Sequence, residues 1–146
     1  MDVKIIPFND GQVVALSKIH FQAFSSLGFS LISGEKLFLA PGCRTMVAID
    51  RRNGRVLGYS QVMERGSICY LSWIAVSKSV RKSGVGFALL KDLKRWAKRR
   101  KCQELMLDSR NRFKEALFFY LRNHFEIVGT FQGQDGDIMI RMRLKL

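Results

Sequence analysis

The loop at residues 77–86 carries the residue types that bind phosphate groups. It reads SKSVRKSGVG and follows a β-branched and aromatic run, SICYLSWIAV, at residues 67–76. An amphipathic sequence, FALLKDLKRWAKRR, comes directly after it. The first backbone N–H groups of a helix have no partner inside the helix and lie at the positive end of its dipole. A strand, a glycine-containing loop and a helix start therefore predict an anion site.

The amino-acid sequence of this loop limits which phosphate-binding motifs it can represent. Gly84 and Gly86 remove side chains where a ligand must approach the backbone closely. Arg81, Lys82 and Ser83 add cationic and hydroxyl donors beside the glycines. The loop is not a Walker loop, because no Gly-Lys-Ser/Thr closes it, and it lacks the third glycine of a dinucleotide fingerprint.

Two segments together resemble a known family. Residues 81–86 form an Arg-x-x-Gly-x-Gly motif after the Ala-Val pair at 75–76, which resembles the acyl-CoA-binding signature of the GCN5-related N-acetyltransferase (GNAT) superfamily. Residues 116–120, followed by Asn-His-Phe at 123–125, are similar to the family's Ala-x-x-x-Tyr-x-x-x-Gly-Phe segment. The two segments occur in the family's order and at about its usual separation.

The resemblance implies roles for individual residues. It implies that residues 81–86 hold the pyrophosphate of coenzyme A and that the backbones of Ile74 and Val76 pair with the pantetheine amides. Tyr120 matches the family tyrosine that acts as general acid, although a core tyrosine with its hydroxyl at the edge is the alternative. Asn111 stands near a position where the family often has asparagine. The expected cofactor-binding residues are Ile74, Ala75, Val76, Arg81, Lys82, Ser83, Gly84, Val85, Gly86 and Asn111.

The implied reaction is transfer of an acyl group from a thioester to an amine by direct attack. Proximity of the reactants and donors aimed at the thioester oxygen supply most of the effect. A lysine, with pKa about 10.4, is rarely neutral at pH 7, so it needs a base more than an α-amino group with pKa about 8 does. Many relatives carry an acidic residue on the strand before the loop, but residues 70–73 contain none. Glu64, in the preceding turn, is the nearest candidate base, and a solvated turn glutamate is the alternative.

Length and composition are those of one ordinary domain. The chain has 146 residues and is 47% hydrophobic, so residues 1–146 can bury a single core. No window reaches the roughly 18 apolar residues that span a bilayer, and the N-terminus has acid and proline where a secretory signal has apolar residues. These features predict a soluble, cytoplasmic protein.

The cysteines and histidines match no metal or disulfide pattern. The cysteines are odd in number and widely spaced, which predicts that they are reduced and partly buried. The histidines have no companions at ligand spacing, so no metal site is expected. These residues are Cys43, Cys69, Cys102, His20 and His124.

The chain is strongly basic. Its 25 Lys and Arg against 12 Asp and Glu give a formal net charge of +13, which attracts anions. Many of these cations lie in residues 91–101, on the polar side and at the C-terminal end of one predicted helix. This helix has two interpretations: a solvated face that complements the helix dipole, or a contact with nucleic acid or the ribosome.

Hydrophobic periodicity predicts a mixed α/β architecture. The order is strand, helix, helix, three strands, helix, strand, helix and two strands, and it matches the GNAT fold, a mostly antiparallel seven-stranded sheet flanked by helices. Asn53-Gly54 predicts a hairpin, Gly58 marks a bulge or a close backbone approach, and the strand-helix-strand unit predicts a parallel pair. The expected strands are 2–8, 44–50, 55–63, 67–76, 104–108, 125–131 and 137–144, and the expected helices are 12–24, 33–39, 84–100 and 110–122.

Two classes of function remain open at this point. The first is an N-acetyltransferase that uses acetyl-CoA, with a primary amine of a small molecule, a peptide or a protein as acceptor, or an RNA-linked amine such as aminoacyl-tRNA. The second is a module of the same fold that senses acyl-CoA or binds nucleic acid without turnover. The net charge argues mildly against strongly cationic small acceptors such as aminoglycosides. The assembly is expected to be a monomer or a homodimer.

Overall fold

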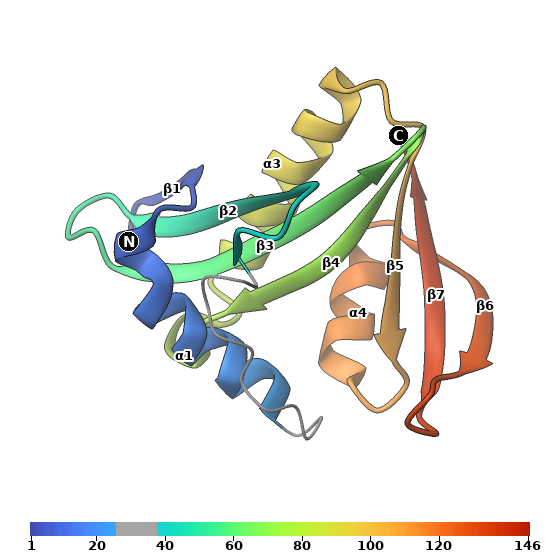
Figure 1. The fold of residues 1–146 in the computed structure, drawn as a ribbon. Coiled ribbons are helices and arrows are strands. Elements are labelled where there is room, and N and C mark those ends of the chain that lie inside the picture. The colour runs from blue at the N-terminus through green and yellow to red at the C-terminus, as the bar shows by residue number, and fades with distance from the viewer. Residues whose placement is uncertain (26–37) are drawn as a thin grey trace.

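A seven-stranded sheet with helices on both faces forms the framework (Figure 1). This computed structural model describes residues 1–25 and 38–146. The strand order is β1-β2-β3-β4-β5-β7-β6. The elements are β1 (Val3–Pro7), η1 (Asp10–Gln12), α1 (Val13–Phe24), β2 (Cys43–Asp50), β3 (Val56–Arg65), β4 (Ile68–Val76), η3 (Lys78–Val80), α3 (Val85–Arg99), β5 (Glu104–Arg110), α4 (Lys114–Arg122), β6 (Glu126–Gln132) and β7 (Ile138–Lys145).

The first four strands form an antiparallel half of the sheet. The hairpin predicted from Asn53-Gly54 is confirmed, and Gly54 has the positive φ of +72° that such a turn requires. Gly58 marks a close approach, as expected, because a Cβ there would lie 2.6 Å from the carbonyl oxygen of Ala75. This glycine therefore lets β3 and β4 lie close together.

The two halves of the sheet meet through a very short contact. β4 and β5 are parallel, as predicted, but they pair only over residues 68–70 and 104–106. A register shift against β3 leaves Ser72 as an extra residue in β4, because Gln61 pairs with Trp73 and Val62 pairs with Leu71. Beyond this bulge β4 and β5 diverge, which Figure 1 shows as two arrows that spread apart.

The second half of the sheet contains β5, β7 and β6. β7 lies between the other two and pairs with β5 from Glu104–Lys145 to Arg110–Met139. The predicted hairpin of β6 and β7 is confirmed. Pairing with β7 also extends β5 to Arg110, so the helix expected over 110–122 begins only at Lys114. Most of the helix expected over 33–39 lies outside the described residues.

Alternate residues of the strands pack against helices on opposite faces. α1 covers one face, where Leu16 and Ile19 pack with Val47 and Tyr59. α3 covers the other face and shares an apolar cluster with α4. No helix in the described part of the chain is long and apolar enough to cross a membrane.

Candidate active site

A cavity of about 180 Å³ lies where β4 and β5 diverge. α1 contributes to its wall from one face of the sheet, and α4 contributes from the other. Residues from both faces of the sheet therefore meet at this cavity. The lining residues are Phe24, Leu71, Ser72, Trp73, Ile74, Leu107, Asp108, Ser109, Arg110, Phe113, Ala116, Tyr120 and Met139.

The predicted phosphate loop joins the end of β4 to the start of α3. Gly84 caps the helix with a φ of +92°, and the position of its missing Cβ is open space. Gly86 packs on α4, since a Cβ there would lie 3.3 Å from the Phe119 ring. Among the described residues, none accepts a hydrogen bond from the backbone N–H groups of residues 82–86. Residues 81–84 are exposed, so the loop presents unpaired donors at a helix N-terminus.

The polar side chains of the loop are exposed. Arg81 donates from Nε to the carbonyl oxygen of Val76 at 3.3 Å, which ties the loop to the end of β4. Ser83 donates to the carbonyl oxygen of Val80. Lys82 adopts a positive φ of +62°, and its side chain makes no ion pair with a described residue. Arg81 and Lys82 therefore give the loop a positive field.

The end of β4 exposes its backbone on the side of β5. Past Tyr70, residues 71–76 have no β5 partner, so half of their N–H and C=O groups point toward the gap. Ile74 lies on the cavity wall, and Ala75 and Val76 lead from it to the loop. The expected cofactor contacts at 74–76 and 81–86 thus form one continuous path from the cavity to the start of α3.

Tyr120 is brought to the same cavity from the opposite half of the sheet. Its ring is buried between Phe119 and Phe125 in edge-to-face contacts with centroid distances of 5.5 Å. Its hydroxyl forms no hydrogen bond within the described part of the chain, and burial raises the pKa of this group well above its ordinary value. The phenol therefore stays protonated at neutral pH and can donate a hydrogen bond or a proton into the cavity.

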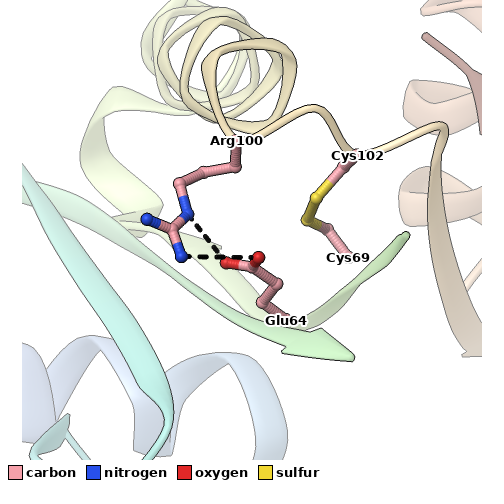
Figure 2. The surroundings of a disulfide bond; sticks show 4 residues. All are labelled: Glu64, Cys69, Arg100 and Cys102. Atoms are coloured by element: carbon pink, nitrogen blue, oxygen red, sulfur yellow. Dashed lines mark hydrogen bonds and ion pairs between the residues drawn. A yellow bond between two sulfur atoms is a disulfide. The ribbon is translucent and has the colours of Figure 1, made fainter. Parts of the chain in front are cut away.

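The structure does not bring Glu64 to the cavity. Glu64 lies opposite Cys69, near the start of β4, whereas the loop follows the end of that strand. Its carboxylate binds Arg100, which follows the C-terminus of α3, with an Nε–Oε2 distance of 2.9 Å (Figure 2). The ion pair holds this carboxylate near the C-terminal end of α3, whereas the loop lies at the N-terminal end of that helix.

Asn111 also lies outside the cavity wall. Its backbone N–H donates to the carbonyl oxygen of Ile138 at 2.9 Å, and its side-chain Oδ1 accepts from Nζ of Lys114 at 3.0 Å. Both partners come from the second half of the sheet and from the start of α4. The structure therefore places Asn111 in the β5–α4 connection and apart from the residues 74–76 and 81–86.

The expectation that the cysteines are reduced is wrong for two of them. Cys69 and Cys102 form a disulfide (Figure 2), and only Cys43 is free. The pair is close because Cys69 lies in the short parallel contact, opposite Leu105, and Cys102 comes shortly before β5. The disulfide lies at the end of the sheet where β4 and β5 are still together.

Sequence reasoning missed most of the cavity wall. The aromatic side of the wall consists of Phe24 and Trp73, which contact each other and the ring of His20 with centroid distances near 4.9 Å. The His20 ring nitrogen Nδ1 bonds to the hydroxyl of Tyr59, and burial lowers the pKa of the histidine. The apolar pattern of residues 12–24 predicts a core position for Phe24. No local pattern indicates that this residue, at the end of α1, lines the cavity.

The arrangement fits an elongated ligand with an anionic part at one end. The unpaired N–H groups of 82–86 and the open space at Gly84 suit a diphosphate. The unpaired edge of residues 71–76 suits an amide-bearing arm, and the phenol of Tyr120 suits a reacting group at its tip. Together these features suit a ligand of the acyl-CoA kind, bound between the halves of a split sheet.

Comparison with known families agrees with a ligand of this kind. The Acetyltransferase (GNAT) family matches residues 13–125, which is most of the chain. The protein therefore belongs to the GNAT acetyltransferase family, and its cofactor is acetyl-CoA. No curated protein sequence matches the chain significantly.

Solved structures show the same fold over nearly the whole chain. A GCN5-related N-acetyltransferase from Kribbella flavida is 22% identical, with a TM-score of 0.81 and coverage of 99% of this chain and 98% of that one. A ribosomal-protein-alanine N-acetyltransferase from Brucella melitensis is 22% identical, with a TM-score of 0.81 and coverage of 98% and 99%. An aminoglycoside 6'-N-acetyltransferase complexed with coenzyme A is 18% identical, with a TM-score of 0.81 and coverage of 97% and 96%.

Proposed function

We propose that this protein is an N-acetyltransferase that transfers the acetyl group of acetyl-CoA to a primary amine by direct attack in a ternary complex. The observation that carries the proposal is the cavity between β4 and β5, which is walled by Tyr120 on one face of the sheet and by Phe24 on the other. In this proposal the coenzyme and the acceptor approach the cavity from different faces of the sheet.

The loop and the edge of β4 bind and orient the coenzyme. In this proposal the N–H groups of residues 82–86 donate to the diphosphate, with Arg81 and Lys82 adding positive charge. The unpaired backbone of Ile74 and Val76 pairs with the pantetheine amides. The diphosphate contacts and the pantetheine contacts lie on one connected segment of the chain. The path of this backbone therefore fixes the position of the thioester at the cavity.

Tyr120 acts as the general acid at the other end of that path. When bound, acetyl-CoA supplies a thioester whose carbonyl carbon forms a C–N bond with the amine as the C–S bond breaks. Tyr120 gives its phenolic proton to the departing sulfur, the nitrogen releases its extra proton to solvent, and a proton from solvent restores the phenol. The high pKa of the buried phenol keeps it in the protonated form that this step needs.

The charges in the cavity favour an acceptor amine of which a fraction is already neutral at pH 7 without a catalytic base. Among the described residues, Asp108 is the carboxylate that lines the cavity, and both of its oxygens bind Arg141 at 2.9 and 3.1 Å. Both oxygens of this carboxylate are therefore already engaged by the guanidinium. We therefore expect an α-amino acceptor, with pKa about 8, to react faster at pH 7 than a lysine side chain with pKa about 10.4.

The lack of a free carboxylate among the described lining residues of the cavity also supports a second candidate function. This function is a module that binds acyl-CoA without turnover. A thiol-release assay with a panel of amines separates the two. The panel contains a peptide with a free α-amino group, the same peptide with that group blocked and one lysine added, and a small polyamine. The proposal predicts CoA release that depends on the amine and is fastest with the free α-amino peptide. No turnover with any amine, together with tight CoA binding, would establish the module instead.

A further inference from the structure

The outer side of α3 carries a row of cations that the proposed reaction does not use. With about 3.6 residues per turn, these residues fall on the side of the helix opposite to the buried Leu89, Leu93 and Ala97. Between the first and the last of them the helix rises about 12 Å. We call this set the basic face of α3: Lys91, Lys94, Arg95, Lys98 and Arg99.

The charge of this face is not compensated within the protein. None of its residues forms an ion pair or a side-chain hydrogen bond with another described residue. Asp92, the acid within α3, is bound by Arg44 with an Nη1–Oδ2 distance of 3.1 Å. Many arginines elsewhere are paired with carboxylates, namely Arg51, Arg52, Arg100, Arg110, Arg112, Arg141 and Arg143.

The coenzyme does not account for the basic face. The diphosphate site lies at the N-terminus of α3, and Lys98 and Arg99 lie at its C-terminus. The protein as a whole carries a net charge of +13. Such a field attracts polyanions, and the basic face adds five cations without an ion-pair partner among the described residues.

We propose that the basic face of α3 binds the phosphate backbone of nucleic acid. A row of exposed cations along one helix can contact successive phosphates without reading bases. Insertion of α3 into a membrane surface is disfavoured, because an interfacial helix must bury an apolar side in lipid. The apolar side of α3 is already packed on the sheet. Binding is therefore independent of base sequence and leaves the α1 side of the cavity open to an acceptor.

The test is fluorescence anisotropy with short labelled RNA duplexes of two unrelated sequences, over a range of salt concentrations. The variant Lys91→Gln/Arg95→Gln/Lys98→Gln removes three charges from the basic face. The control, Lys4→Gln/Lys18→Gln/Lys145→Gln, removes the same charge from exposed residues on other elements that have no ion-pair partner in the described part of the chain.

The wild type should bind both duplexes with similar affinity and lose affinity steeply with salt. The basic-face variant should bind at least about tenfold more weakly, and its salt slope should be lower by about two to three, roughly one for each phosphate that it no longer neutralises. The control should behave like the wild type. Equal weakening in both variants, a strong preference for one duplex, or binding of anionic vesicles but of neither duplex would overturn the proposal, as would a wild type that binds neither.

Calorimetric titration of CoA into all three proteins keeps this proposal separate from the proposed function. The basic face lies away from residues 81–86, so CoA affinity should be unchanged in both triple variants. A protein that binds RNA through α3 but does not bind CoA would contradict the proposed function alone. The reverse result would contradict the nucleic-acid proposal alone.

Discussion

The hydroxyl of Tyr120 is a polar group at the edge of an apolar cluster, and it bonds to no other described residue. The Tyr120 ring packs on Phe119 and Phe125, and these contacts explain why the ring is buried. They do not explain why this position carries a hydroxyl group. A reacting group in the cavity would supply the missing partner. The general-acid proposal therefore concerns the oxygen alone and can be tested without disturbing the packing.

Tyr120→Phe should lower kcat by about 10² to 10⁴, the usual range for loss of a general acid. The unfolding midpoint should stay close to that of the wild type, because the ring contacts remain. Steady-state thiol release measures the first quantity, and thermal unfolding measures the second. A variant with the kcat of the wild type would contradict the assigned role.

Tyr59→Phe is the matched control. Its hydroxyl is also buried but bonds to His20, and neither of these two residues lines the cavity. Its loss should cost about 1 kcal/mol of unfolding free energy and leave kcat nearly unchanged. Because burial raises the pKa of Tyr120, ionisation of this group should not lower the wild-type kcat below about pH 10, its ordinary pKa.

Gly84→Ala should weaken CoA binding by about tenfold or more, because the left-handed φ of +92° positions the loop donors and is costly for alanine. Gly54→Ala is the control, since Gly54 also has a positive φ and open space at its Cβ but lies in the β2–β3 turn. Both variants should lose about 1 to 2 kcal/mol of stability. Calorimetry should show reduced affinity in Gly84→Ala only, and equal affinities would contradict the proposed place of the diphosphate.

Local chemistry explains which site residues could be predicted from the sequence. The loop glycines and Tyr120 stand in short motifs whose spacing is visible in the chain. Glu64 is close to β4 in sequence, but strand register places it opposite Cys69, beside Arg100. Its partner is 36 residues away in sequence, and no local pattern encodes that contact.

Secondary structure was predicted best where the signal is local. Asn53-Gly54 identified its hairpin, and the alternating and helical apolar patterns located the strands and α3. The start of α4 was predicted four residues too early, at Arg110 instead of Lys114. Arg110 joins β5 by pairing with Met139 and by binding Asp137 at 2.8 Å, and both contacts depend on β7.

The Cys69–Cys102 disulfide shows the same limit, because cysteine spacing alone does not reveal which strands will lie together. The disulfide closes a loop with a sequence separation of 33 residues. Its loss should lower the unfolding free energy by about 3 to 4 kcal/mol in the loop-entropy account. Urea unfolding with and without reductant measures this difference.

Cys43→Ser is the control for that experiment, because the Cys43 thiol is free. It should respond to reductant as the wild type does, whereas Cys102→Ser should show the lower stability with no further effect of reductant. Alkylation of the unreduced protein should modify one cysteine per chain. Three modified cysteines, or a midpoint that reductant does not change, would contradict the disulfide.

At the scale of the whole molecule, the site is the gap in an otherwise continuous sheet. The sequence predicted a parallel pair after β4, but that pairing ends at Tyr70 and Met106, just before the bulge that Ser72 forms against β3. Both the pairing and the bulge are non-local, so the cavity wall could not be derived from the motifs. The motifs located the loop and Tyr120, and the structure supplies the residues around the gap.

A crystal structure of the protein with CoA would show directly whether the coenzyme lies in the gap of the sheet. We expect the diphosphate on the N–H groups of residues 82–86, the pantetheine arm along residues 74–76, and the sulfur within hydrogen-bond reach of the Tyr120 hydroxyl. A coenzyme bound away from the gap between β4 and β5, or a sulfur remote from Tyr120, would contradict this expectation.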